Sequence, residues 1–167
     1  MKDIGLARGS VQLQPHSKAW AILFKKESVS IKEALGSVIV EHVGSTAIPT
    51  VPAKPIVDIA IPYSRQDEAM RWIEPLHDLG FEYKGEEGVP GRFFFVKGPE
   101  KNRTVYLHVV DKEEFRRLVR FRDALIKDGV LATEYSDLKQ QLAKQYADDR
   151  KSYTHEKAKF IERVLGV

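Results

Sequence analysis

An aspartate in the middle of a short apolar run restricts what this chain can fold into more than any other residue. The run is IVDIAI, residues 56–61, and its composition is typical of a strand inside a sheet. A buried carboxylate without a partner is costly, so Asp58 must be paired with a cation, bound to a metal or directed at a ligand. Because side chains alternate along a strand, Asp58 shares a face with Ile56 and Ala60. A functional site and a structural ion pair are equally open interpretations.

A second strand and a turn are predicted just before this run. Residues 38–43 alternate between two faces, as a strand requires. Gly44, Ser45 and Thr46 then break the pattern with small residues, whose backbone N–H groups can turn toward a bound anion. Three prolines, at positions 49, 52 and 55, restrict the loop that leads into the Asp58 strand.

Residues 41–59, EHVGSTAIPTVPAKPIVDI, resemble the signature of the GrpB family, which is related to the nucleotidyltransferase superfamily. The resemblance extends from Val11 to about Leu165 and includes RFFF at Arg92, LHV at Leu107 and FRD at Phe121. In nucleotidyltransferases a Gly-Ser turn holds the nucleotide phosphates. Acidic side chains, commonly spaced Asp-x-Asp with a third on a neighbouring strand, hold divalent cations. The resemblance therefore implies a nucleotide-binding function for the Gly44 turn and Asp58.

The chain departs from the nucleotidyltransferase pattern at the second acidic position, which is Ala60. Two-metal phosphoryl transfer needs several oxygen ligands, so we do not expect a full polymerase-like metal site. On the predicted strand 104–110, His108 occupies the position where the superfamily often has its third acid. Asp58 and His108 are thus the predicted catalytic residues, and together they could ligate one divalent cation, Mg²⁺, Mn²⁺ or Zn²⁺. The alternative is that His108 is structural and hydrogen-bonded to a carboxylate.

Basic residues lie on or beside the apolar stripes of three predicted C-terminal helices. Arg122, Lys139 and Lys157 each need an acceptor if they face inward. That acceptor could be an internal acid, Asp58, Asp123 or Glu41, or the phosphate or carboxylate of a small molecule that Lys54 and Arg92 also reach. The predicted ligand-binding residues are Gly44, Ser45, Thr46, Lys54, Arg92, Arg122, Lys139, Tyr153 and Lys157.

Composition narrows the remaining classes of function. The 167 residues suffice for one domain, and the absence of cysteine excludes disulfides, thiolate nucleophiles and cysteine-ligated zinc. A net charge of +3, with basic and acidic residues mixed along the chain, does not favour a nucleic-acid partner. No apolar run is long enough for a membrane span and the first residues lack a signal-peptide core, so a cytoplasmic protein is expected. The oligomeric state is left open.

The predicted fold is a single α+β domain, residues 1–167. A mixed sheet of about five strands forms a nucleotidyltransferase-like core over residues 11–110, covered on one side by helices at 17–35 and 64–79. The second helix should begin with a capping box at Ser64 and Asp67 and should kink or break at Pro75. Residues 1–10 are expected to be a loose terminus, and residues 111–167 a helical unit that closes the domain.

Two functions from different classes follow from this sequence. The first is a divergent nucleotidyl- or phosphotransferase that uses Asp58, His108 and one metal ion. The second is a module that binds a nucleotide or another phosphorylated small molecule and has lost the metal-binding pair of carboxylates.

Overall fold

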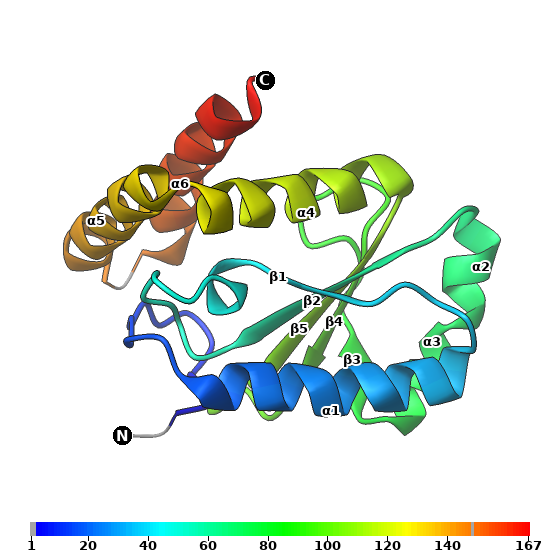
Figure 1. Ribbon diagram of the computed structural model, residues 1–167. Helices are drawn as coiled ribbons and strands as arrows, with labels where there is room; N and C mark the ends of the chain where they lie inside the picture. Colours follow the sequence, from blue (N-terminus) through cyan, green and yellow to red (C-terminus); the bar gives the residue numbers. More distant parts are fainter. Residues whose placement is uncertain (1–2, 148) are drawn as a thin grey trace.

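The computed structural model describes residues 3–147 and 149–167. Its centre is one five-stranded sheet with the order β1-β2-β5-β4-β3 (Figure 1). Neighbouring strands are antiparallel except β2 and β5, which run parallel. The predicted α+β class and mixed sheet are confirmed, although the first strand begins three residues later than predicted. The strands are β1 (Glu41–Val43), β2 (Val57–Pro62), β3 (Phe81–Tyr83), β4 (Phe93–Lys97) and β5 (Val105–Val110).

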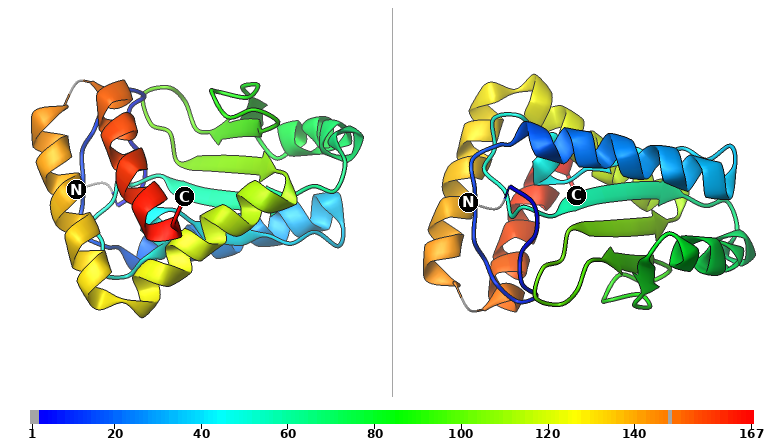
Figure 2. Two further views of the ribbon diagram at one scale, coloured as in Figure 1. Left: turned by 90° about the horizontal axis from the view of Figure 1, so that it is seen from above. Right: turned by 90° about the horizontal axis from the view of Figure 1, so that it is seen from below.

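Helices lie on both sides of this sheet, and the last three form a unit of their own (Figures 1 and 2). Helix α1 (Lys18–Leu35) runs along one face, together with α2 (Gln66–Arg71) and α3 (Ile73–Asp78). The C-terminal unit consists of α4 (Lys112–Lys127), α5 (Gly129–Gln145) and α6 (Arg150–Leu165). In residues 3–147 and 149–167, no helix combines the length and apolarity needed to cross a bilayer.

Helix ends follow local side-chain chemistry in most places. Ser17 accepts a hydrogen bond from the N–H of Ala19 and starts α1, and the Asp111 carboxylate accepts two from the first turn of α4. The predicted capping box at Ser64 is wrong, because no side chain caps α2 and the carboxylate of Glu68 accepts from the Ser64 N–H instead. The break expected near Pro75 is confirmed, since the segment divides into α2 and α3 just before it.

The main core uses alternate residues of the two central strands. The side chains that point toward α1 and α3 are fully buried: Val57, Ile59 and Ile61 from β2, and Val105, Leu107 and Val109 from β5. They pack against Trp20 and Ile31 of α1 and Leu76 of α3. The intervening residues, among them Asp58 and His108, face the opposite way. The predicted division of faces is confirmed.

A second core joins the C-terminal helices to the proline-rich loop. Ile48 and Val51 of the loop pack among Phe121 of α4, Tyr135 of α5 and Phe160 of α6. This packing fixes the loop between the sheet and the helical unit. Lysines that the loop and the helices carry are thereby brought to the same end of β2.

The N-terminal segment is attached to the sheet rather than loose. Leu6 is buried and pairs with Arg103 through an isolated β-bridge, and the Gly5 N–H donates to the Pro55 carbonyl at 2.7 Å. The expectation of a loose terminus is therefore wrong for residues 3–10. Backbone pairing of this kind leaves little trace in side-chain pattern, because any residue except proline can supply the groups.

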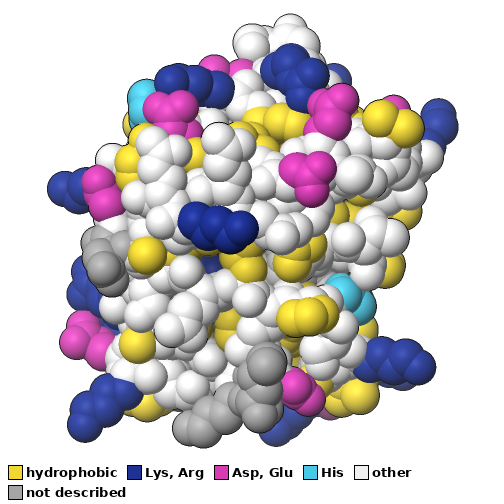
Figure 3. Space-filling view, turned by 90° about the vertical axis from the view of Figure 1, so that its left-hand side faces the viewer, with side chains coloured by type: hydrophobic (Ala, Val, Ile, Leu, Met, Phe, Trp, Pro, Cys, Tyr) yellow, Lys and Arg dark blue, Asp and Glu magenta, His cyan; other side chains and the backbone are white. Residues whose placement is uncertain are grey.

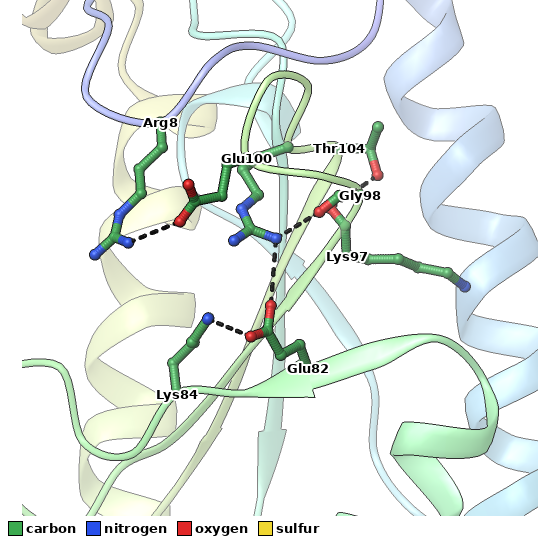
Figure 4. Close-up of polar contacts among 8 residues, drawn as sticks. Arg8, Glu82, Lys84, Lys97, Gly98, Glu100 and Thr104 are labelled. Atoms are coloured by element: carbon green, nitrogen blue, oxygen red, sulfur yellow. Dashed lines mark hydrogen bonds and ion pairs between the residues drawn. The ribbon is translucent and has the colours of Figure 1, made fainter.

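Cations near this attachment are matched by acids (Figure 4). Arg8 pairs with Glu100 at 3.1 Å, and Glu82 pairs with both Lys84 and the buried Arg103. Arg103 also donates to the Gly98 carbonyl. These contacts tie the start of the chain to the β4–β5 hairpin.

Candidate functional site

Asp58 and His108 meet on the face of the sheet that looks toward the C-terminal helices. In the parallel pairing of β2 with β5, Asp58 lies opposite Tyr106 and His108 lies opposite Ala60. The His108 Nε2 is 2.9 Å from the Asp58 Oδ1, and the two side chains keep 15% and 30% of their surface exposed. Both side chains are therefore partly exposed to solvent.

Arg92 determines which nitrogen of His108 carries the hydrogen. Its Nη1 lies 3.3 Å from the His108 Nδ1, and a guanidinium can only donate. We infer that Nδ1 accepts this bond and that Nε2–H donates to Asp58. Arg92 itself is oriented by the carbonyls of Glu86, at 3.0 Å, and Glu87, at 2.7 Å. The chain thus contains an arginine, histidine and aspartate in series.

The turn after β1 touches the Asp58 carboxylate directly. Gly44 has a φ of +69°, and a Cβ added to it would lie 2.7 Å from the Asp58 Oδ2. Only glycine permits this approach. Thr46 is buried and its Oγ1 lies 2.9 Å from the His42 Nε2, so Thr46 holds the turn in place. Of the three predicted turn residues, Gly44 adjoins the acid, Ser45 is half-buried beside it, and Thr46 is structural.

Three lysines gather at the same end of β2. The Nζ atoms of Lys54 and Lys157 lie 5.5 Å and 5.6 Å from the centre of the Tyr153 ring. Lys139 is only 2% exposed, lies 5.2 Å from the centre of the Tyr135 ring, and donates to the Pro52 carbonyl. The structure therefore brings Lys54, Lys157 and Tyr153 together as predicted, while Lys139 is buried beneath them.

The lysines and Asp58 alter one another's protonation. Burial, followed by the charges of Lys157 and Arg150, lowers the pKa of Lys54 to about 7, against the attraction of Asp58. Burial and the two neighbouring lysines also hold the pKa of Lys139 well below its ordinary value. Burial acts to raise the pKa of the Asp58 carboxyl, but His108 and the charges of two lysines outweigh it, so this pKa is lowered. The site combines one ionised acid with an excess of basic groups.

Tyr153 lies between the lysines with a hydroxyl that lacks a partner. Within the part of the chain that the structure describes, its buried oxygen makes no hydrogen bond. Burial raises the pKa of Tyr153 to about 12. A buried hydroxyl without a partner is unfavourable, and such groups concentrate at functional sites.

Arg122 belongs to a structural contact and not to this cluster. Its Nη1 is 2.6 Å from the Glu41 Oε2 and 2.7 Å from the His42 carbonyl oxygen, and its Nε is 2.8 Å from the Asp123 Oδ1. These bonds fasten α4 to β1. Two kinds of acceptor were considered for Arg122, internal acids and the anion of a ligand. The structure supplies the internal acids, which corrects the assignment of Arg122 to ligand binding.

Arg150 is a basic residue of the site that sequence reasoning missed. Its guanidinium carbon lies 5.7 Å from the centre of the Tyr106 ring, and its charge acts on Lys54. Arg150 and side chains of the β4–β5 hairpin line a common cavity of about 40 Å³. The spacing of Arg150, Tyr153 and Lys157, at i, i+3 and i+7, places all three on one helical face and could have identified it. The cavity is lined by Arg8, Lys84, Glu87, Phe94, Val96, Arg103, Tyr106 and Arg150.

The residues around Asp58 do not fit a resident divalent cation. Among residues 3–147 and 149–167, no group of three or more His, Asp or Glu side chains is placed to hold a metal. The two predicted ligands, Asp58 and His108, are hydrogen-bonded to each other. Lys54 and Lys157 would repel a cation that entered without accompanying anions.

Charge elsewhere on the surface is mixed. Figure 3 shows the face formed by the left-hand side of Figure 1, where Lys and Arg side chains are scattered among Asp and Glu. Among the side chains coloured in that view, the basic ones do not form a continuous patch.

The chain is similar to known proteins over almost its whole length. A family model described as "GrpB protein" matches residues 10–166. A UPF0157 protein of Pseudomonas aeruginosa is 35% identical over 161 residues, which cover 93% of this chain and 66% of the relative's length. The crystal structure of the conserved protein GrpB from Enterococcus faecalis has a TM-score of 0.81 and 31% identity, and the match covers 93% of this chain and 98% of that one.

A more distant likeness concerns the fold alone. The Cid1 poly(U) polymerase matches with a TM-score of 0.55 at 12% identity, over 78% of this chain and 44% of the polymerase. The fold of the present chain is therefore nucleotidyltransferase-like.

Proposed function

We propose that this protein, which belongs to the GrpB family, binds a nucleotide or another phosphorylated small molecule in the cationic site around Asp58. One observation carries the proposal. Lys54, Lys139 and Lys157 converge from a loop and two helices on a single carboxylate, and the pKa values of Lys54 and Lys139 are lowered. The folded protein thus holds positive charge at an energetic cost that a bound anion would relieve.

The geometry supports a phosphate at the edge of the lysine cluster. Lys54 and Lys157 flank Tyr153 and lie close enough to Asp58 to lower its pKa. The Lys157 ammonium and the Arg150 guanidinium, with Lys54 beside them, suit a group that carries two negative charges. The nucleotidyltransferase-like fold favours a nucleotide among such ligands, since the Cid1 polymerase has been solved with MgGTP bound.

A binding module is the form of this proposal that the residues favour. Ala60 removes the second carboxylate of a metal pair, and the neighbouring strand supplies His108 instead of a third acid. A transferase is the second candidate, because a lowered pKa keeps Asp58 ionised at neutral pH. In that case the metal would arrive with the phosphates of the ligand. The two candidates differ in whether binding requires a divalent cation.

Thermal unfolding in the presence of ligands tests the proposal. The panel contains ATP, ADP, AMP, coenzyme A and inorganic phosphate, each with EDTA or with Mg²⁺, Mn²⁺ or Zn²⁺. A ligand at roughly a hundredfold excess over its dissociation constant should raise the free energy of unfolding by about 2.7 kcal/mol. We expect this stabilisation with at least one phosphorylated ligand in EDTA.

A matched pair of variants on α6 locates the binding site. Lys157→Gln removes a cation beside Tyr153, so at least a tenfold higher ligand concentration should be needed for the same stabilisation. Lys159→Gln removes an exposed lysine that pairs with Glu156, and the ligand concentration needed should not change. Binding that requires a metal would favour the transferase. Absence of stabilisation by every ligand, or equal loss in both variants, would overturn the proposed site.

A further inference from the structure

Lys54 extends from an unusually well-fixed part of the loop. The preceding residue, Ala53, exchanges two backbone hydrogen bonds with Gln14, at 2.8 Å and 2.9 Å. The following residue, Pro55, accepts a bond from the Gly5 N–H at 2.7 Å, and Ile56 donates to the Lys54 carbonyl at 2.7 Å. These hydrogen bonds fix the backbone that carries Lys54, which favours precise positioning of its amine.

The surroundings of the Lys54 amine are mostly cationic. Its Nζ and that of Lys157 both lie near the Tyr153 ring, and the charges of Lys157 and Arg150 oppose that of a single acid, Asp58. The groups that act on it come from three elements: Asp58 of β2, Lys139 of α5, and Arg150, Tyr153 and Lys157 of α6. The pKa of Lys54, lowered to about 7, leaves about half of its molecules as the neutral amine at neutral pH. At pH 7 an ordinary lysine, with a pKa near 10.4, is neutral in only about one molecule in 2,500.

A neutral amine between cations is the arrangement that nucleophilic lysines require. The lone pair on nitrogen attacks an electrophile, whereas an ammonium has none to offer. Lys54 is half-buried rather than fully enclosed, so part of its side chain contacts solvent. The anion-binding role proposed for Lys157 and Arg150 would hold a phosphorylated ligand beside it.

We propose that Lys54 is a nucleophile and that this site captures a phosphorylated small molecule with an aldehyde or ketone group as an imine. The inference rests on the proposed function and names the class of ligand. In the reaction, the Nζ lone pair forms a bond to the carbonyl carbon while the π electrons move to oxygen. The oxygen takes up a proton, and the resulting carbinolamine loses water as the nitrogen gives up its hydrogens. The balance is one amine and one carbonyl to one imine and one water, without an oxidant or reductant.

Competitive acetylation of the whole protein tests the amine itself. Trace acetic anhydride is applied between pH 5 and pH 11, and the acetylated lysines are quantified by mass spectrometry. Lys54 should reach half of its full reactivity near pH 7, about three pH units below the ordinary lysine value. In Lys157→Gln this midpoint should move upward. A Lys54 midpoint near pH 10 in the parent protein would overturn the inference.

Trapping with pyridoxal 5′-phosphate tests the ligand class. The probe combines a phosphate with an aldehyde, and borohydride converts its imine to a stable amine that peptide mapping locates. At pH 7 we expect the adduct at Lys54 at roughly a thousandfold higher yield than at exposed lysines, from the difference in the fraction of neutral amine. Pyridoxal, which lacks the phosphate, should label Lys54 far less.

Lys54→Arg tests whether the adduct forms at the predicted amine. The variant keeps a positive charge but loses the primary amine, so the specific adduct should disappear. Adducts spread evenly over the lysines, or equal labelling by pyridoxal, would refute imine capture. If phosphorylated ligands stabilise the protein and Lys54 is not labelled, the proposed function stands without the imine. If no phosphorylated ligand stabilises the protein and Lys54 is not labelled, both the proposed function and imine capture are refuted.

Discussion

The two faces of strands β2 and β5 differ sharply although they share one backbone. Toward α1 and α3 the side chains are aliphatic and fully buried. Toward the C-terminal helices the alternate positions hold Asp58 and His108, and lysines from a loop and two helices approach them. Alternation thus lets one pair of strands supply both a core and a polar site. A slip of one residue in register would exchange the two sets.

The comparison indicates that the polar face of β2 and β5 contributes less to the stability of the fold than the apolar face. The apolar face consists of well-packed side chains, whereas the polar face contains a buried lysine, a tyrosine hydroxyl without a partner in the described residues, and crowded cations. Proteins tolerate such features where function needs them. Variants that act on one face or the other can test this division.

The largest effect is expected from truncating the apolar face. Leu107→Ala removes a side chain with 0% exposure and should lower the free energy of unfolding by about 3 kcal/mol, measured by urea denaturation. His108→Gln, the next residue in the same strand, should cost about 1 kcal/mol or less, because the site is partly exposed and an amide can still contact Asp58. Equal losses would contradict the division of roles between the faces.

A pH-dependent effect is expected from His42, whose ring stacks on Phe24 beside the Gly44 turn. Burial, with Arg122 assisting and Asp58 opposing, lowers the pKa of His42 to about 4. Between pH 6.5 and pH 4 the unfolded chain binds a proton that the folded chain does not, so acidification lowers stability. We expect a loss of about 2 to 3 kcal/mol over this window, measured by urea denaturation.

The His42→Gln variant should lack most of this loss, since glutamine can still bond to Thr46 without titrating. The matched control is His77→Gln, which removes a histidine with 79% side-chain exposure and should leave the pH profile unchanged. A parent protein whose stability stays constant from pH 6.5 to pH 4 would show that His42 is not held neutral by the fold.

The smallest effect has the opposite sign. The lowered pKa of Lys54 means that its charge opposes folding, fully below pH 7 and progressively less as the pH rises toward 10.4. Lys54→Gln should therefore stabilise the ligand-free protein at pH 6 by about 1 kcal/mol, discounted for partial exposure, and the gain should vanish near pH 10. Urea denaturation at the two pH values measures it. Lys26→Gln, which changes an exposed lysine, serves as the control. If Lys54→Gln lowers the free energy of unfolding at pH 6, the charge of Lys54 does not oppose folding.

Much of the fold can be predicted because its signals are local. Alternation along residues 56–61 and 104–110 is sufficient to place Asp58 and His108 on the face opposite the aliphatic core residues of their own strands, and the Asp111 cap marks the start of α4. Long-range contacts are different. No local pattern shows that β2 and β5 are parallel neighbours, or that Glu41 rather than a ligand satisfies Arg122. The burial of Lys139 against the Pro52 carbonyl depends on how the loop packs, which one sequence does not reveal.

The parallel pairing of β2 with β5 has a consequence for how the protein is made. Asp58 and His108 are fifty residues apart in the chain, and two helices and two strands intervene. Contacts across such a separation form late, because a long loop must be closed before they yield any gain. During synthesis the imidazole cannot reach the carboxylate until β5 has been translated and inserted between β2 and β4. A ligand that needs both groups would thus recognise only finished molecules.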